Sequence, residues 1–295
     1  ADLAREKDVV LQELAEAQDT PSDIVFDELW SAAFAEQPLG RSVLGDEAGL
    51  ERIATADLHR WREQGYRAGS LILSVAGQVD HDALVALAAE RFADLPTGRA
   101  ASAPSASFTP LRRTGRAKAD QAQLTLGLAA PHARADDYLA ARMFADVAGG
   151  GASSRLFQAL REERGLAYAV SASLHPHEEV GLFYVHAATA RRDAASAAGL
   201  IEAVLEETAA TLTQRELDRV HTQARAGLAM QLETPWGQAS YAARQLAVHG
   251  RLIEPAEVIA ALARLSVDEV RAAGQHILAG ERAAATIGVP AARAA

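Results

Sequence analysis

The stretch at 149–170, GGGASSRLFQALREERGLAYAV, combines three structural signals in immediate succession. Three glycines lead through two serines into an amphipathic helical pattern over 153–164, which a glycine stops before a strand-like run. Glycine adopts backbone conformations closed to other residues, and it commonly ends helices. The stretch therefore predicts a glycine loop, a helix and a strand. Arg161 falls in the last helical turn, and Tyr168 is the third residue of the strand run.

The residues around this stretch extend the same pattern. A strand is expected at 122–131 and a helix at 134–148 before the glycines. After them, 166–175 and 181–190 read as an antiparallel pair joined by a turn that contains proline. The rest of this half is helical until the end, with helices expected at 193–212, 214–233, 236–249, 254–264 and 266–279 and a last strand at 283–289.

The first half also mixes helices with an apolar strand pattern. Helices are expected at 1–18, 21–35, 46–52, 55–66 and 80–93, and SLILSVAGQV at 70–79 predicts a buried strand. Strand pairs followed by runs of helices indicate the α+β class. The length of 295 residues favours two domains. We assign 1–105 to a first domain, 106–120 to a linker and 121–295 to a second domain.

Composition limits the possible partners. The formal net charge is −10, whereas nucleic acids and anionic membranes call for a basic surface. No apolar run reaches the length of a transmembrane helix. Cysteine is absent, so a metal site would need His and carboxylate ligands. The chain is expected to be soluble, in either the periplasm or the cytoplasm.

Glu6 and Glu13 are candidate metal-site residues in the first helix. They lie seven residues apart, which places them on one helix face but about 10 Å apart along the axis. Both therefore cannot bind a single ion. One could be a ligand and the other a supporting carboxylate. The alternative is an ordinary solvated helix face.

The glycine stretch offers a second candidate site. Gly149, Gly150 and Gly151 would form a mobile loop at the mouth of a cavity, with Ser153 or Ser154 capping the helix. A phosphate site is the weaker interpretation, because the fingerprints GxxxxGK[ST] and GxGxxG are absent.

Arg161 and Tyr168 would place a guanidinium and a phenol beside a substrate, as donors to an oxyanion. Alternatively, Arg161 is a surface cation and Tyr168 a half-buried strand residue. Neither HExxH nor HxxEH occurs among the nine histidines. His175 and His177 flank Pro176 in a turn, where we expect the side chains to point into solvent.

Taken together, these motifs resemble the M16 metallopeptidases, the family of pitrilysin, insulin-degrading enzyme and the mitochondrial processing peptidase. EKDVVLQELAEAQDTPSD resembles the family segment after the zinc motif HxxEH, where a helix carries the third zinc ligand and an earlier glutamate. GGGASSRLFQALREERGLAYAV resembles the family's glycine-rich stretch and the Arg/Tyr pair that follows it. The run at 66–96 is also similar to the family, and the resemblance covers nearly the whole chain.

The resemblance implies two similar α+β domains, each an antiparallel-rich sheet packed with helices, that close as a clamshell around a short or unfolded peptide. It implies a zinc endopeptidase in which Glu13 is the metal ligand and Glu6 supports the site. Arg161 and Tyr168 would contact the substrate from the second domain, with Gly149, Gly150, Gly151 and Ser153 lining the peptide channel. A homo- or hetero-oligomer with another M16-type subunit is also expected.

The resemblance departs from the family at one point. Zn²⁺ would need two histidines from an HxxEH motif, which residues 1–295 do not contain. We expect the chain to be a fragment that is inactive alone, with the motif upstream in the intact protein. The alternative is a non-catalytic M16-like partner or scaffold subunit.

Overall fold

A computed structural model describes residues 2–115 and 119–289. Its first part is helical and ends in one short strand, and the elements agree closely with the helices expected from the sequence. They are α1 (Asp2–Gln18), α2 (Pro21–Ala33), η1 (Pro38–Gly40), α3 (Glu47–Arg52), α4 (Thr55–Gly65), η2 (Ala68–Ser70), α5 (His81–Arg91) and β1 (Arg112–Gly115).

The second part contains four longer strands, with helices between and after them. The elements are β2 (Gln121–Ala130), α6 (Tyr138–Gly149), η3 (Phe157–Glu162), β3 (Ala167–Pro176), β4 (Gly181–Ala190), η4 (Arg191–Asp193), α7 (Ala194–Thr211), α8 (Gln214–Gln231), α9 (Pro235–His249), α10 (Pro255–Arg264), α11 (Val267–Ala279) and β5 (Arg282–Ile287).

The five strands form one mixed sheet in the order β1-β5-β2-β4-β3. β1 runs parallel to β5, and the other pairs are antiparallel. The predicted pairing of 166–175 with 181–190 is confirmed, since β3 and β4 are adjacent. The α+β class is confirmed as well. β3 forms one edge of the sheet and β1 the other, within the described part of the chain.

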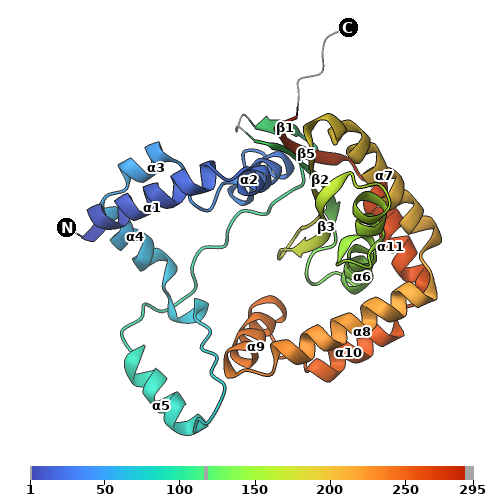
Figure 1. Cartoon of the computed structure of the whole chain (residues 1–295). Helices are drawn as coiled ribbons and strands as arrows, with labels where there is room; N and C mark the ends of the chain where they lie inside the picture. The colour runs from blue at the N-terminus through green and yellow to red at the C-terminus, as the bar shows by residue number, and fades with distance from the viewer. Residues whose placement is uncertain (1, 116–118, 290–295) are drawn as a thin grey trace.

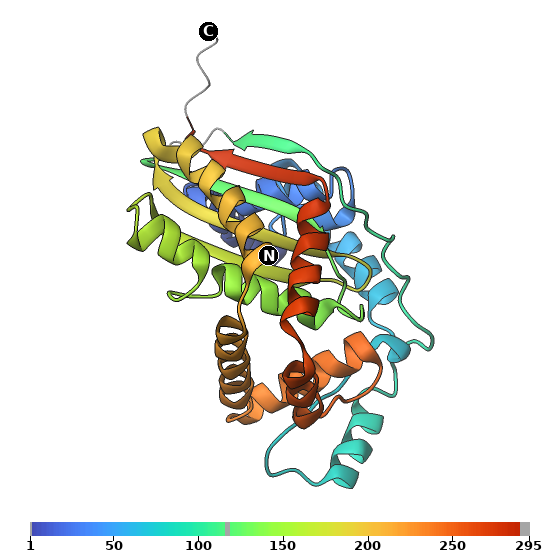
Figure 2. The same ribbon diagram turned by 90° about the vertical axis from the view of Figure 1, so that its right-hand side faces the viewer.

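One face of the sheet carries the larger hydrophobic core. Successive side chains of a strand point to opposite faces, so Phe183, Val185 and Ala187 of β4 all point to the same side. There they meet α6, α7 and α11, which contribute Phe144, Ile201 and other buried residues. Figure 2 shows α7 and α11 lying across this face.

The other face is covered by α2. Pro21 stands at the first turn of this helix, where its missing N–H is no loss. Val25, Leu29 and Phe34 are fully buried against Leu182 of β4 and alternate residues of β5. α2 lies in the segment that we assigned to the first domain. Even so, it shares a hydrophobic core with the sheet of the second.

The segment assigned as a linker, 106–120, is partly ordered by the same core. The Thr109 hydroxyl donates to the Ala32 carbonyl at 2.7 Å and accepts from the Ala35 N–H at 3.0 Å. Phe108 packs edge-to-face on Phe34. The chain then enters β1, and residues 116–118 lie outside the described residues.

The strand predicted at 70–79 is wrong. The segment is not part of the sheet, and the chain there pairs with no other strand in the described ranges. Leu71, Ile72, Leu73 and Val75 are 44–50% exposed. The apolar, β-branched composition of 70–79 is typical of a strand, but a strand also needs neighbouring N–H and C=O groups to pair with.

α1, α3, α4 and α5 extend away from the sheet as an arm (Figure 1). The arm meets the rest of the molecule again at α9, where the Ser74 hydroxyl donates to the Ala239 carbonyl at 2.8 Å. Among residues 2–115 and 119–289, no helix combines the length and apolar character needed to span a bilayer.

Candidate functional site

The helix predicted at 153–164 contains a π-helical segment, η3. The Glu163 N–H donates to the Gln158 carbonyl five residues earlier, at 2.9 Å. π-helical turns are rare and occur frequently at functional sites. The wider turn also shifts the faces on which later residues lie relative to an ordinary helix. Hydrophobic periodicity alone could not show this feature, because the sequence fits an α-helix equally well.

Gly165 ends this helix, as predicted. Its φ of +59° lies in the left-handed region that favours glycine. The Gly165 N–H donates to the Arg161 carbonyl at 3.2 Å, and the Leu166 N–H donates to the Leu160 carbonyl at 2.7 Å. The Gly165 bond is that of an αL cap, and the Leu166 bond reaches six residues back, across the wider π-helical turn. The backbone that carries Arg161 is therefore tied directly to the start of β3.

Arg161 lies on the surface. Its guanidinium carbon is 4.9 Å from the centre of the Phe157 ring, which is a cation–π contact within one helical turn. Such a contact restricts the arginine stem without consuming its N–H donors. The guanidinium therefore stays available to an acceptor from outside the chain.

Tyr168 is displayed by an irregularity in β3. Ala167 pairs with Thr189 and Ala169 pairs with Ala188, so Tyr168 is an extra residue in the ladder. A β-bulge of this kind re-aims the side chain of the bulged residue. Tyr168 is 63% exposed on the edge strand of the sheet. The structure therefore leaves a phenol and a guanidinium exposed on either side of one tight turn.

The first glycine of the stretch lies in a helix and not in a loop. Gly149 is the last residue of α6 and is buried. A Cβ added there would lie 2.2 Å from the backbone nitrogen of Ala172 in β3. Its role is to let α6 approach the strand closely, so the prediction of a mobile loop is wrong for this residue. Gly150, Gly151 and Ser153 are exposed.

We expect Gly149→Ala to destabilise the protein by about 1–3 kcal/mol, because the new methyl group would overlap the backbone of β3. Urea unfolding measures the change. Gly199 is the matched control, since it is also helical and a Cβ there meets nothing within 4 Å. Gly199→Ala should stabilise by roughly 0.5–1 kcal/mol. Equal behaviour of the two variants would contradict close packing at Gly149.

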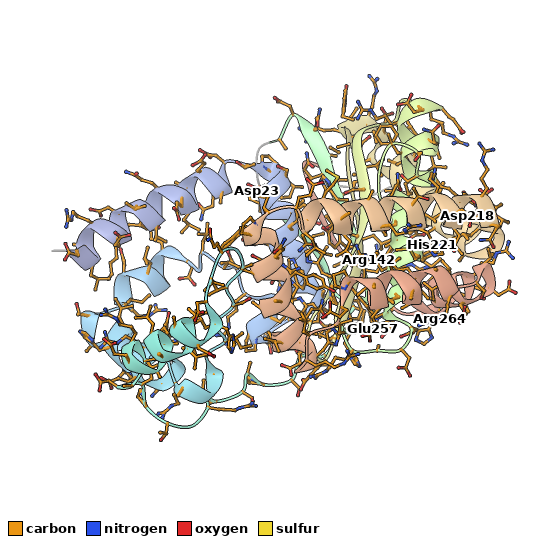
Figure 3. The ribbon with its side chains drawn as sticks, turned by 90° about the horizontal axis from the view of Figure 1, so that it is seen from below. Asp23, Arg142, Asp218, His221, Glu257 and Arg264 are labelled. Carbon is orange, nitrogen blue, oxygen red and sulfur yellow. The ribbon has the colours of Figure 1, made fainter. Side chains whose placement is uncertain are left out.

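Glu6 and Glu13 are both exposed on α1. The residues that the structure describes contain no group of three His, Asp or Glu side chains arranged to hold a metal ion. The Glu13 carboxylate is a suitable donor for zinc, but the described residues alone do not make a zinc site. His221 and Asp218 lie on α8, which Figures 1 and 3 place far from α1. These two side chains therefore do not join Glu13 in a metal site.

His175 is exposed, as predicted, but His177 is only partly exposed, so the prediction of a ring pointing into solvent is wrong for His177. Their rings stand 6.0 and 5.3 Å from the ring of Trp30 on α2, measured between centroids. Burial lowers the pKa of both imidazoles, and His175 lowers the pKa of His177 further. The turn was recognised from Pro176, but the helix that covers it comes from 145 residues earlier in the chain.

The comparisons with known proteins place this fold in a family. The family model for the peptidase M16 inactive domain matches residues 52–224. That match covers more than half of the chain, so the chain belongs to the M16 peptidase family.

The relatives carry a consistent name. An uncharacterized zinc protease of Rickettsia bellii is 30% identical over 97% of this chain and 70% of its own length. An uncharacterized zinc protease of Mycobacterium tuberculosis is 31% identical over 97% of the chain and 67% of its own length.

Two solved structures share the fold. The M16 inactive domain from Pseudomonas fluorescens has a TM-score of 0.90 at 22% identity, covering all of this chain and 72% of that one. A protease from Helicobacter pylori has a TM-score of 0.87 at 18% identity, covering 98% of this chain and 72% of that one.

Proposed function

We propose that this chain is the substrate-binding part of a zinc-dependent endopeptidase that cleaves short or unfolded peptides. The observation that carries the proposal is the display of Arg161 and Tyr168 on either side of the turn that joins η3 to β3. Both side chains are exposed although their backbones are held by the cap at Gly165 and by the sheet. Rigidly held, exposed donors are suited to binding a peptide backbone.

In this proposal Arg161 and Tyr168 donate hydrogen bonds to carbonyl oxygens of the bound peptide. The phenol and the guanidinium would strengthen these bonds as negative charge develops on the oxygen of the scissile carbonyl. Gly150, Gly151 and Ser153 would lie along the peptide. Gly149 would act indirectly, because it allows α6 to pack closely against β3.

Glu13 is proposed as one zinc ligand and Glu6 as a carboxylate that supports it. The remaining ligands would come from residues outside 1–295. The names of the relatives support zinc, since they are called zinc proteases. We further propose a two-domain clamshell and an oligomer with another M16-type subunit, in which the exposed pair faces the peptide.

Tyr168→Phe should raise the barrier to peptide cleavage by about 2–4 kcal/mol, because it removes one donor and keeps the ring. Stability should hardly change, since the side chain is largely exposed. The measurement is kcat/KM of the full-length protein on an unstructured fluorogenic peptide. Tyr66→Phe removes a hydroxyl from a tyrosine that is exposed on the arm, and it should leave kcat/KM unchanged. A Tyr168→Phe protein with normal kcat/KM would show that the Tyr168 hydroxyl has no part in catalysis.

A non-catalytic partner or scaffold subunit is the second candidate function. Two observations favour it: the family model describes an inactive domain, and the described residues complete no metal site. Zinc content of the purified full-length protein separates the two functions. One zinc per chain supports the peptidase. A protein without zinc that becomes active only when mixed with a second M16 subunit supports the scaffold.

A further inference from the structure

One arginine at the start of the η3 helix uses every donor of its side chain. The Arg155 Nε and Nη2 atoms donate to the two carboxylate oxygens of Glu216 at 2.7 and 2.8 Å. Its Nη1 donates to the Thr211 hydroxyl at 2.7 Å and the Glu207 carbonyl at 3.4 Å, and Nη2 also donates to the Thr211 carbonyl at 3.1 Å. A guanidinium has five N–H groups, and five hydrogen bonds occupy it fully.

The partners of Arg155 all lie at the corner between α7 and α8. The last carbonyls of a helix lack partners within it, and a cation there is favourable. Arg155 satisfies one of these carbonyls, that of Thr211, at the end of α7. Arg271 of α11 donates to the next one, that of Leu212, at 2.9 and 2.6 Å. The corner is thereby bound to two other elements, the η3 helix and α11.

Glu216 holds the corner from the other side. Its carboxylate accepts from the Thr213 N–H at 2.9 Å and from the Thr213 hydroxyl at 2.7 Å, which completes the capping box of α8. Both side chains of the Arg155–Glu216 ion pair are about one-fifth exposed. Hydrogen bonds from Arg155 and Thr213 lower the pKa of Glu216 to about 2, so the carboxylate is ionised at neutral pH.

The position of this ion pair connects it to the candidate site. Arg155 lies two residues before η3 and the αL cap at Gly165 follows it, so hydrogen bonds hold the helix at both ends. Between these two points lies the π-helical turn that ends near Arg161. A long helix in a large core needs no such fastening, but η3 is only six residues long and its outer side is exposed.

We propose that Arg155 and Glu216 are positioning residues that set where η3, and with it the Arg161/Tyr168 pair, meets a peptide. The inference rests on the proposed function, because that function assigns Arg161 and Tyr168 to peptide binding. It goes beyond that function by giving a role to two residues that do not touch the peptide. Fork-to-fork geometry with a carboxylate is a property of arginine that lysine cannot reproduce.

The test uses Arg155→Lys in the full-length protein and follows amide hydrogen exchange. Exchange over 157–168 should accelerate by about tenfold or more, while the core strands β2 and β4 stay protected. The matched control is Arg251→Lys, which breaks a bidentate pair at 2.6 and 3.1 Å between the segment after α9 and Glu257 of α10, and it should leave exchange over 157–168 unchanged. Glu216→Gln is the milder second variant should Arg155→Lys fold poorly. Unchanged exchange over 157–168 in both variants would overturn the proposal.

Peptide affinity is the second readout, because it requires no hydrolysis. A labelled unstructured peptide should bind Arg155→Lys about ten- to a hundredfold more weakly than the unmodified protein. Arg155→Lys added to the double variant Arg161→Ala/Tyr168→Phe should weaken binding no further, since Arg155 acts through these two side chains. Additive losses of peptide affinity would overturn the inference. Full peptide affinity despite faster exchange would do so as well, because the Arg155–Glu216 ion pair would then be purely structural. Binding without cleavage would contradict the proposed peptidase and still support the positioning role.

Discussion

Replacing Glu13 by Gln in the full-length protein should abolish peptide cleavage and remove zinc from the purified protein. The amide is nearly the same size as the carboxylate but lacks the negative charge that a zinc ligand supplies. Folding should be unaffected, because Glu13 is exposed on α1. Zinc content by elemental analysis and kcat/KM on an unstructured peptide are measured together with the thermal midpoint.

Two variants on the same helix make this result specific. Glu16→Gln removes an equivalent exposed charge and should keep both zinc and activity. Glu6→Gln should weaken zinc binding or activity by about 10–100-fold, as expected for a carboxylate that supports a ligand. A Glu13→Gln protein with full zinc and normal cleavage would identify Glu6 and Glu13 as part of a solvated helix face.

Phe34→Ala should destabilise the protein by about 3–5 kcal/mol, which is the usual cost of removing a fully buried aromatic ring. Phe34 is completely buried at the end of α2 and stacks at 5.5 Å on Trp30. It also joins the helix to Phe108 in the segment that leads to β1. Its removal therefore loosens α2, the sheet and this segment together. The free energy of unfolding in urea measures the effect.

The control for this prediction is Phe92→Ala, since Phe92 is 41% exposed at the end of α5. We expect a change several-fold smaller than that of Phe34→Ala. A loss below about 1 kcal/mol in Phe34→Ala would mean that α2 is not part of the core of the sheet. Residues 1–105 would then behave as a unit of their own.

Much of the secondary structure could be predicted because its signals are local. The β3–β4 pair was recognisable from two apolar runs around a proline turn, but the register shift at Tyr168 was not. α8 begins at Thr213, three residues before Glu216, and this spacing is that of a capping box. α9 begins at Pro235, a residue favoured in the first helical turn.

The candidate site was predictable only in part. Arg161 and Tyr168 were identified through their resemblance to a family motif, and both are exposed in the structure. Arg155 was missed, although the capping-box spacing that marks its partner Glu216 was present in the sequence. No local pattern could pair these two residues, because they lie 61 positions apart.

The sequence by itself determined the helices, most strands, the α+β class and the family, since all of these depend on spacing between near neighbours. Tertiary structure alone decided that α2 covers the sheet, that 71–76 lacks a strand partner and that Gly149 is a packing residue. It also decided that η3 is held through Arg155. These features require atoms distant in the chain to occupy one place, and hydrogen bonds and close packing form only between groups already brought together.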